Sequence, residues 1–226
     1  NASDAIDKLY FKSLQTGNTG MSRSDFWIEL KADKEARTLT ITDNGIGMTE
    51  EELENNLGVI AKSGSQDFKK NNEELKADDI NIIGQFGVGF YSAFMVSDRV
   101  EVLSKAYGAD KAYVWSSNGA EGYEIKEAEK DSNGTVITLH IKKDEDGEDY
   151  SRYLEEYTLK SLVKKYSNYI SYPIKMICTK YDYDVPEGEE PKKTQELETL
   201  NSMQPIWKRA KADVKEEEYS QFYKDT

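Results

Sequence analysis

Short runs in which apolar and polar residues alternate predict the strands of a sheet. Phe26, Ile28 and Leu30 alternate with Trp27 and Glu29, which gives one face of such a strand an apolar lining. Runs with the same period lie at 38–43, 99–105, 111–117, 122–128, 134–141 and 174–178. Glycine, aspartate and asparagine separate the four runs between 99 and 141, so we expect these strands to follow one another as a meander.

Other segments repeat apolar residues with the 3.6-residue period of a helix. The first of them, 1–14, places Ile6 and Leu9 on one side and polar residues on the other. A second begins with the text T-E-E-E, in which Thr49 and Glu52 form a capping box. The sequence therefore predicts helices at 1–14, from 49 onward, at 90–96 and at 154–170.

The order of these elements predicts the fold class. A helix, strands, two further helices around a loop, a strand meander and a last helix indicate an α+β two-layer sandwich, with helices on one face of a mostly antiparallel sheet. We expect residues 1–181 to form this domain. Residues 182–205 hold three of the four prolines and many acidic residues, which is typical of a linker. Apolar residues return at 206–226, where a further domain is expected to begin.

The charge balance bears on the partners. The 226 residues include 30 lysines and arginines against 43 aspartates and glutamates, a net charge of −13. Affinity for nucleic-acid backbones comes mainly from lysine and arginine, so the acidity argues against a nucleic-acid partner. No stretch approaches the roughly 18 consecutive apolar residues of a membrane-spanning helix, so we expect no membrane partner.

Cysteine and histidine each occur once, as Cys178 and His140. This excludes an internal disulfide and a Cys/His zinc site, and it leaves no Ser-His-Asp triad unless His140 serves. His140 lies in the middle of a predicted strand and is expected to be structural. Cys178 is expected to be a small apolar residue on a strand. With this cysteine usage and no visible targeting signal, we expect a cytoplasmic location.

The segment T-D-N-G-I-G-M at 42–48 allows two interpretations. Asn-Gly after an alternating strand is a strong hairpin signal, but the capped helix that follows is not a second strand. In the second interpretation Asp43 lies at the end of a strand, faces a cavity and accepts a hydrogen bond from the exocyclic amine of adenine. Gly45 and Gly47 would then let the backbone approach a flat ligand closely.

A glycine-rich segment, G-Q-F-G-V-G-F at 84–90, leads into an apolar run. Free N–H groups at the start of a helix form an anion cradle, although the spacing matches neither the Walker A nor the Rossmann pattern. The alternative is a flexible hinge. Lys62-Ser63-Gly64, in the apolar-poor stretch 61–83, is either a solvated loop or part of a mobile lid that carries a cation and a hydroxyl to a ligand.

Asn1, Asp4 and Lys8 form a polar stripe on the first predicted helix. Such a stripe is ordinarily the solvent face of a helix. In the functional alternative, Asn1 binds a phosphate-bound Mg²⁺, an ion that keeps several waters and needs few protein ligands. This alternative would let an acidic protein hold a triphosphate without a basic patch.

Five stretches, taken together, resemble one known family. They are N-A-S-D-A-I-D-K at 1–8, D-N-G-I-G-M at 43–48, N-N-L-G-V-I-A-K-S-G at 55–64, I-G-Q-F-G-V-G-F-Y-S-A-F at 83–94 and G-T-V-I-T-L-H at 134–140. In this order they resemble the amino-terminal ATPase domain of the ninety-kilodalton heat-shock chaperones, in its bacterial form, over essentially the whole chain. The D-x-G-x-G core is shared with type II topoisomerases, sensor histidine kinases and mismatch-repair ATPases. A histidine-kinase-type ATP-binding domain is therefore the alternative.

The resemblance implies a Bergerat-type sandwich in which ATP or ADP binds with Mg²⁺ between helices and sheet. Asp43 would accept from the adenine amino group, and Thr135 would complete a water-mediated contact. Residues 62–89 would form the lid, and 87–90 would offer backbone N–H groups to the phosphates. The remaining residues that the resemblance places at the nucleotide are Asn1 (also the Mg²⁺ ligand), Asp4, Ala5, Lys8, Gly47, Met48, Asn56, Leu57, Lys62, Ser63, Gly87, Val88, Gly89, Phe90 and Ile137.

The resemblance also implies a chaperone cycle in the parent protein. Lid closure over Mg-ATP, homodimerisation and hydrolysis would assist the folding of client proteins that are unfolded or partly folded. In the family, the general-base glutamate lies one helical turn before position 1, and an activating arginine lies in the middle domain, whose start would be 206–226. Removing a positioned general base typically costs 10²–10⁴-fold in rate. We therefore expect this chain to bind nucleotide, to hydrolyse it poorly and to hold no catalytic residue of its own.

Overall fold

The computed structural model describes residues 1–16, 21–58, 83–84, 87–145, 147–182, 184, 191–205 and 216. Its helices are α1 (Ala2–Thr16), α2 (Glu50–Leu57), α4 (Ala93–Val96) and α5 (Glu156–Tyr166), and its 3₁₀ helices are η1 (Arg23–Asp25), η2 (Gly89–Ser92) and η3 (Ser151–Leu154). The strands are β1 (Ile28–Asp33), β2 (Thr38–Asp43), β3 (Ser97–Lys105), β4 (Ala112–Ser117), β5 (Tyr123–Ala128), β6 (Gly134–Ile141), β7 (Ile174–Asp182) and β8 (Lys192–Thr199).

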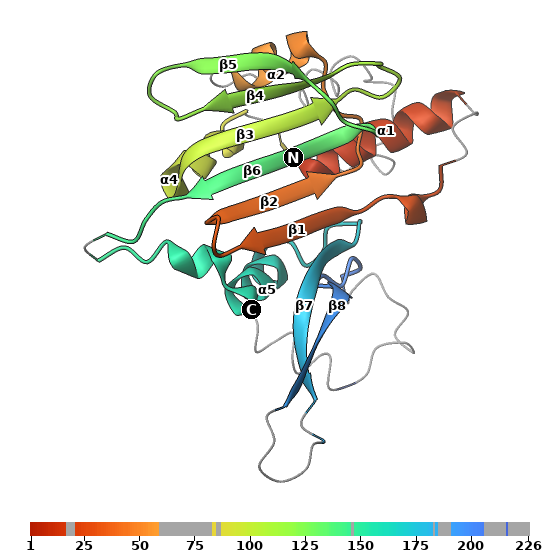
Figure 1. Ribbon diagram of the computed structural model, residues 1–226. Coiled ribbons are helices and arrows are strands. Elements are labelled where there is room, and N and C mark those ends of the chain that lie inside the picture. The colour runs from red at the N-terminus through yellow and green to blue at the C-terminus, as the bar shows by residue number, and fades with distance from the viewer. Residues whose placement is uncertain are drawn as a thin grey trace.

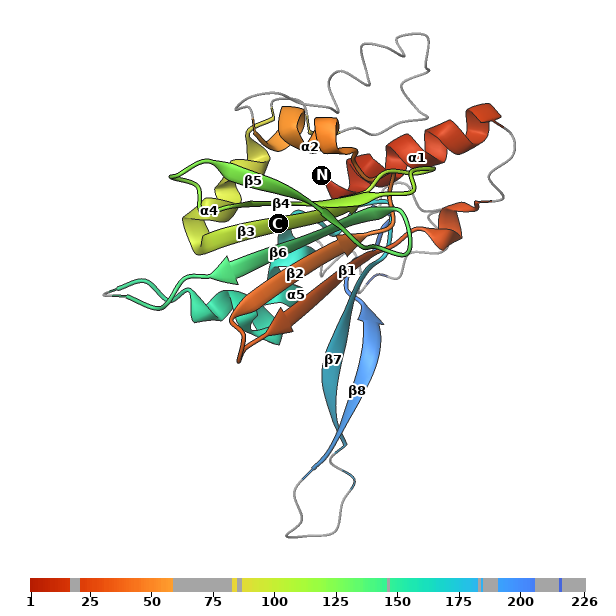
Figure 2. The same cartoon turned by 45° about the horizontal axis from the view of Figure 1, so that its top comes forward.

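The strands form one eight-stranded sheet in the order β5-β4-β3-β6-β2-β1-β7-β8. Neighbouring strands are antiparallel except β1 and β7, which run parallel where Ile28–Leu30 pairs with Ile174–Met176. The helices lie behind one face of the sheet in Figure 1, and the turned view of Figure 2 shows α1 and α2 along that same side. The α+β sandwich with a mostly antiparallel sheet is confirmed. The expected meander holds for β3, β4 and β5 but is wrong for β6, which returns past them to lie between β3 and β2.

The core fills the space between the helices and this face of the sheet. The apolar period of α1 buries Ile6 and Leu9 completely, and the alternation of β3 does the same for Val100 and Val102. The capping box predicted at Thr49 is present, with Glu52 Oε2 accepting from the Thr49 N–H at 2.8 Å. It fixes the start of α2, so that this helix can turn its apolar residues toward the same core.

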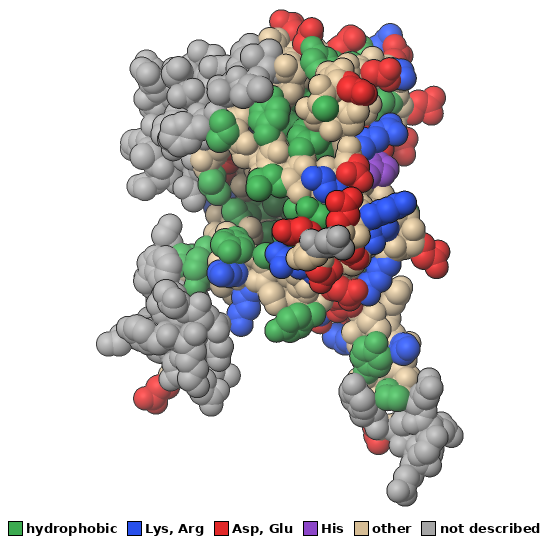
Figure 3. Space-filling model, turned by 90° about the vertical axis from the view of Figure 1, so that its left-hand side faces the viewer, with side chains coloured by type: hydrophobic (Ala, Val, Ile, Leu, Met, Phe, Trp, Pro, Cys, Tyr) green, Lys and Arg blue, Asp and Glu red, His purple; other side chains and the backbone are tan. Residues whose placement is uncertain are grey.

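The opposite face of the sheet is polar. Buried Leu139 and Ile141 point to the core, so His140 between them points away from it. There its Nε2 lies 2.8 Å from Glu101 Oε2, and Arg99 Nη2 lies 2.7 Å from Glu101 Oε1. Figure 3 shows the single histidine among acidic and basic side chains along one border of the molecule. His140 is therefore one member of a surface charge cluster.

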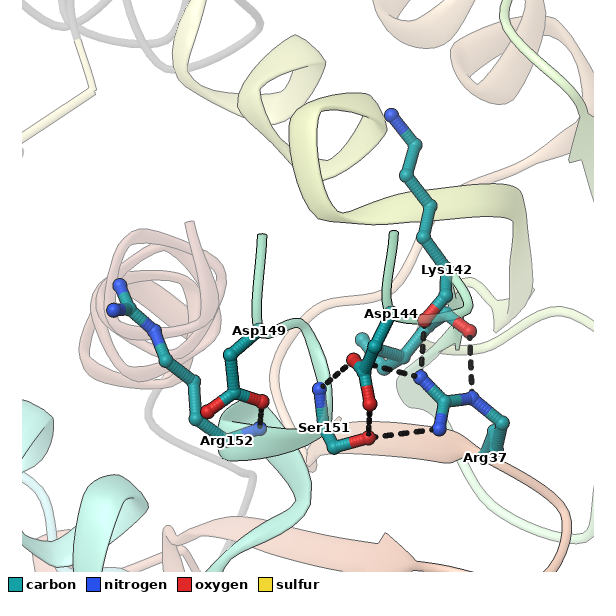
Figure 4. A network of polar contacts seen from close by, with 7 residues as sticks. Arg37, Lys142, Asp144, Asp149, Ser151 and Arg152 are labelled. Atoms are coloured by element: carbon teal, nitrogen blue, oxygen red, sulfur yellow. Dashed lines mark hydrogen bonds and ion pairs between the residues drawn. The ribbon is translucent and has the colours of Figure 1, made fainter. Parts of the chain in front are cut away.

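A polar network closes the far end of the sheet from α1 (Figure 4). Arg37, in the turn between β1 and β2, has a φ of 50° and directs its guanidinium at the connection between β6 and η3. It donates to Ser151 Oγ at 2.8 Å and to the carbonyl of Lys142, and it forms an ion pair with Asp144 at 3.5 Å. Asp144 in turn accepts from the Ser151 N–H at 2.7 Å. One side chain thus ties the hairpin to the segment that leads into η3 and α5.

The helix predicted at 154–170 is shorter than the sequence suggests. It divides into η3 and α5, with extended backbone at Glu155, and α5 ends at Tyr166. Beyond it the carbonyl of Asn168 accepts from the N–H groups of Ser202 at 3.0 Å and Met203 at 2.9 Å. This contact ties the segment after α5 to the chain that follows β8.

The linker predicted over 182–205 contains a strand, because 192–199 forms β8 and pairs with Lys175–Asp182 of β7. All but one of its residues are exposed, so the strand lacks the apolar alternation that would have identified it. Its charges are paired instead, with Lys180 on Glu196 and Lys160 on Glu198. Asn201 then anchors the strand's end, since its Oδ1 accepts from the Ile174 N–H at 2.8 Å.

The domain boundaries stay a prediction. Of residues 206–226 only Glu216 is described, so the expected start of a further domain lies outside the described residues. Cys178 is confirmed as a buried residue on β7, where burial raises the pKa of its thiol to about 11. Within the described part of the chain, no helix combines the length and the apolar character that crossing a membrane requires.

Candidate functional site

The loop that follows β2 is held against α1 by backbone contacts. The Ile46 N–H donates to the Ala5 carbonyl at 3.0 Å, and Gly45 lies so close to the helix that a Cβ there would be 2.6 Å from the Ala5 carbonyl carbon. Asn133 completes the anchoring, since its Nδ2 donates to the Gly45 carbonyl at 2.6 Å. The hairpin interpretation of Asn44-Gly45 is thus wrong, because the chain turns onto α1 and continues to α2.

Gly47 in the same loop is required by its protein neighbours. Its φ is +67°, and a Cβ at this position would lie 1.9 Å from the Lys105 carbonyl oxygen. Any other residue would strain the backbone and collide with the end of β3. This contact explains the glycine without a ligand, so a role of Gly47 in nucleotide binding stays a prediction.

Asp43, the last residue of β2, is a buried carboxylate with a raised pKa. Its exposed fraction is 5%, and burial raises its pKa from 3.8 to about 6, although the Gly45 N–H donates to Oδ1 at 2.9 Å and opposes the shift. No lysine or arginine in the described residues forms an ion pair with it. A buried carboxylate without a cationic partner is costly to the fold and marks a candidate functional group.

Two buried hydroxyl groups lie beside this carboxylate on the neighbouring strands. Thr135 of β6 pairs with Asp43 across the ladder, and Ser104 of β3 pairs with Thr135 on the other side. The two hydroxyl oxygens are 3.0 Å apart, and Ser104 Oγ also accepts from the Met48 N–H at 2.9 Å. Carboxylate and hydroxyls therefore form one polar group at the end of three adjacent strands, on the helix side of the sheet.

The polar stripe on α1 is not simply a solvent face. Asn1 is exposed and Lys8 half-buried, but Asp4 is 1% exposed. Its two oxygens accept from the backbone N–H groups of Ile83 at 2.9 Å and Gly84 at 2.8 Å. The interpretation as a solvated stripe is wrong for Asp4, because this side chain binds the beginning of the glycine-rich segment.

The described part of the glycine-rich segment differs from the predicted helix start. Residues 90–96 were expected as one helix, but η2 is a 3₁₀ helix and α4 a single α-helical turn. Such short elements have only a small helix dipole. An anion at this place would therefore be bound by individual backbone N–H groups, without the added attraction of a long helix. Val88 is 54% exposed, a Cβ at Gly89 would meet nothing within 4 Å, and Gly87 has a φ of 66°.

The remaining predicted residues divide into three groups. Asn56 and Leu57 end α2, where the Tyr91 hydroxyl donates to the Leu57 carbonyl at 3.1 Å and so joins α2 to η2. The ring of Phe90 packs edge-on against that of Trp115, with 5.6 Å between the ring centroids. Met48, Phe90 and Ile137 are partly buried against the core. Lys62 and Ser63 lie outside the described residues, so nothing tests their place at the site.

Sequence reasoning missed two polar residues of this site, Ser104 and Asn133. Ser104 shares the inward face of β3 with Val100 and Val102, so a hydroxyl on an apolar face was the available signal. Asn133 precedes Gly134 in a turn, and such residues are usually assigned to turn geometry alone. Nothing in the sequence distinguishes its contact with Gly45, which joins segments 88 residues apart.

Comparison with known proteins identifies the family. Residues 17–147, more than half of the chain, match a family described as histidine kinase-, DNA gyrase B- and HSP90-like ATPase. The chain belongs to this family. Two further segments of the chain, 152–196 and 187–226, match a second family described as Hsp90 protein.

Relatives of the chain that carry the name "Chaperone protein HtpG" include proteins from three species. The chain is 55% identical over 223 residues to the protein from Clostridium perfringens (strain 13 / Type A), and this alignment covers 99% of the chain and 36% of that protein. It is 56% identical over 223 residues to the protein from Clostridium botulinum (strain Langeland), where the alignment covers 99% of the chain and 35% of that protein. It is 54% identical over 225 residues to the one from Natranaerobius thermophilus, 100% of this chain and 36% of that protein. The chain thus spans about a third of the length of these curated relatives. Their names favour the chaperone branch over the histidine-kinase alternative.

Proposed function

We propose that this chain is the nucleotide-binding ATPase domain of an HtpG-type molecular chaperone. ATP or ADP would bind on the helix side of the sheet, at the end of β2, β6 and β3. Membership of the ATPase family and the buried polar group around Asp43 support this proposal. The single observation that carries it is the Asp43 carboxylate, buried and without an ion-pair partner among the described residues, with its pKa raised to about 6.

Asp43 has the chemistry that adenine requires. An ionised carboxylate only accepts hydrogen bonds, and the 6-amino group of adenine donates two. At neutral pH the carboxylate is ionised despite its burial, since neutrality lies above its pKa. A guanine would present a carbonyl oxygen at the same place, and two acceptors repel each other. Asp43 would therefore select adenine nucleotides, and the hydroxyl of Thr135 would hold the water that completes the contact.

The residues at the start of α1 suit a phosphate-bound Mg²⁺. Among the described residues, no group of three or more histidine, cysteine, aspartate or glutamate side chains is placed to hold a metal ion. Mg²⁺ in nucleotide sites is bound mainly by phosphates and water, with one or two protein oxygens. The exposed Asn1 would offer an amide oxygen, whereas the Asp4 carboxylate is only 1% exposed and accepts from two backbone N–H groups. When bound, Mg²⁺ would neutralise phosphate charge.

The first prediction tests the adenine contact. Titration calorimetry of Mg-ADP against Asp43→Asn should show an affinity at least about ten-fold lower than that of the unchanged chain, because a hydrogen bond to a charged group is lost. Asp7→Asn is the matched control. Asp7 is also a buried carboxylate whose pKa is raised by burial, but it accepts from the Tyr172 hydroxyl. Equal affinities of all three proteins would overturn the proposal.

The activity of the whole protein is part of the proposal. The parent protein would hydrolyse ATP and assist client proteins as a homodimer in the cytoplasm. The name of the relatives supports the chaperone role, and the family supports the ATPase activity. The dimer, the clients and the compartment rest on the family resemblance.

A further inference from the structure

Asp4 has the lowest exposed fraction of any described carboxylate, 1%, and its partners are backbone groups. Each oxygen accepts from one N–H, Oδ1 from Ile83 and Oδ2 from Gly84. Hydrogen bonds to a charged acceptor are roughly twice as strong as neutral ones. Two of them from consecutive N–H groups fix both the position and the orientation of a backbone that lies 79 residues away in the sequence.

The neighbouring residue of α1 holds the other half of the site. Ala5 accepts from the Ile46 N–H at 3.0 Å, in the loop that begins at Asp43. Asp4 and Ala5 are consecutive residues of one helix, so α1 sets the distance between this loop and the start of the glycine-rich segment. The described continuation of that segment, from Gly87 onward, is held elsewhere by the Tyr91 hydroxyl on α2.

We propose that Asp4 is a positioning residue for the phosphate end of the nucleotide. It fixes the backbone at Ile83 and Gly84 relative to Asp43, so that the N–H groups of 87–90, farther along the same segment, face the phosphates without Asp4 touching the ligand. The inference rests on the proposed function. It assigns Asp4 a different role from direct nucleotide contact, because this side chain is only 1% exposed and each of its oxygens accepts from a backbone N–H group.

Substitution by asparagine is the sharpest test, because it keeps the shape and changes the chemistry. The amide has one oxygen and one NH₂ group, so one of the two backbone N–H groups would face a donor instead of an acceptor. Asp7→Asn is again the matched control, one turn along the same helix. There the amide oxygen can still accept from the Tyr172 hydroxyl, which now lies 2.5 Å from Asp7 Oδ1.

The experiment compares Mg-ADP with adenosine, which lacks phosphates, by titration of the unchanged chain, Asp4→Asn and Asp7→Asn. We expect Asp4→Asn to lower the affinity for Mg-ADP about ten-fold and that for adenosine less than about two-fold, which a general loss of stability would not do. Asp7→Asn should change neither by more than about two-fold. An unchanged ratio of the two affinities in Asp4→Asn overturns the inference, whether both are retained or both are lost.

Hydrogen exchange on the unchanged chain tests the same contact without a variant. The amides of Ile83 and Gly84 should be protected from exchange, and exchange at the rate of free peptides would overturn the inference even if Asp4→Asn failed to fold. The two proposals fail separately. If the unchanged chain binds no Mg-ADP, the proposed function is wrong. If it binds Mg-ADP and Asp4→Asn binds it equally well, only the role of Asp4 is wrong.

Discussion

At the scale of single residues, the site depends on carboxylates that are buried among backbone groups. Asp4 satisfies both of its oxygens with N–H groups, whereas Asp43 carries a pKa raised by burial to about 6. Asp43 begins the loop that the Ile46 N–H attaches to Ala5 of α1, and Asp4 is the residue before Ala5 in that helix. A motif that contains aspartate does not reveal this difference, since it depends on what the fold places around each side chain.

The raised pKa of Asp43 predicts how stability depends on pH. In the unfolded chain its pKa is 3.8, so between about pH 4 and 6 the folded state binds more protons. The contribution of Asp43 to the free energy of unfolding is therefore fully present below pH 3.8 and is lost as the pH rises through about 6. Without nucleotide, the free energy of unfolding of the unchanged chain should fall relative to Asp43→Asn by up to about 3 kcal/mol from pH 4 to pH 7. Urea unfolding at several pH values measures this, and a difference that does not vary with pH would contradict it.

At the scale of elements, the sequence predicted best where one period governs a segment. The alternation of 134–141 and the capping box at Thr49 specify β6 and the start of α2 locally, and both form as predicted. Strand β8 was missed because its stabilising contacts are charge pairs with β7 and α5, which no period within 192–199 records. Polar contacts to distant backbone, such as those of Asp4 and Asn133, were missed for the same reason.

Arg37 gives a prediction at this scale, because it combines a strained backbone with a network of side-chain contacts. Arg37→Ala should lower the free energy of unfolding by about 1–3 kcal/mol, through loss of the contacts to Ser151 and the Lys142 carbonyl. Arg37→Gly loses the same contacts but tolerates the φ of 50°. It should be more stable than Arg37→Ala by about 1 kcal/mol. Denaturant unfolding compares the two, and an alanine variant as stable as the unchanged chain would show that the network contributes nothing.

At the scale of the whole molecule, fold class and family were within reach of the sequence, whereas the packing of the site was not. The first of the five family-like stretches lies in α1, and this helix brings two of the others, 43–48 and 83–94, together through Ala5 and Asp4. The reason for glycine at 47 became visible only with Lys105 beside it. Which residue such a position requires is determined by tertiary contacts, and a local sequence pattern does not contain them.

Nucleotide binding should stabilise the whole domain. A ligand that binds only the folded state at about 100 times its Kd adds about 2.7 kcal/mol, which corresponds to a rise in Tm of roughly 5–10 °C for a chain of this length. Mg-ADP should produce this rise in a thermal scan, and Mg-GDP should not. Asp43→Asn should show little rise with either nucleotide. An equal rise with both nucleotides would contradict the adenine selectivity.

The parallel pairing of β1 with β7 has a mechanical consequence. Three residue pairs, from Ile28 with Ile174 to Leu30 with Met176, join β7 and β8 to the other six strands. Tension applied to the chain beyond β8 would act first on the hydrogen bonds of Asn201 and then on this short junction, before it reached the long ladders around β6. The β7–β8 ribbon would then separate at this junction before the loop at Asp43 and its contacts with α1 were disturbed. A pull from the carboxyl-terminal side would thus be absorbed before it deformed the nucleotide site.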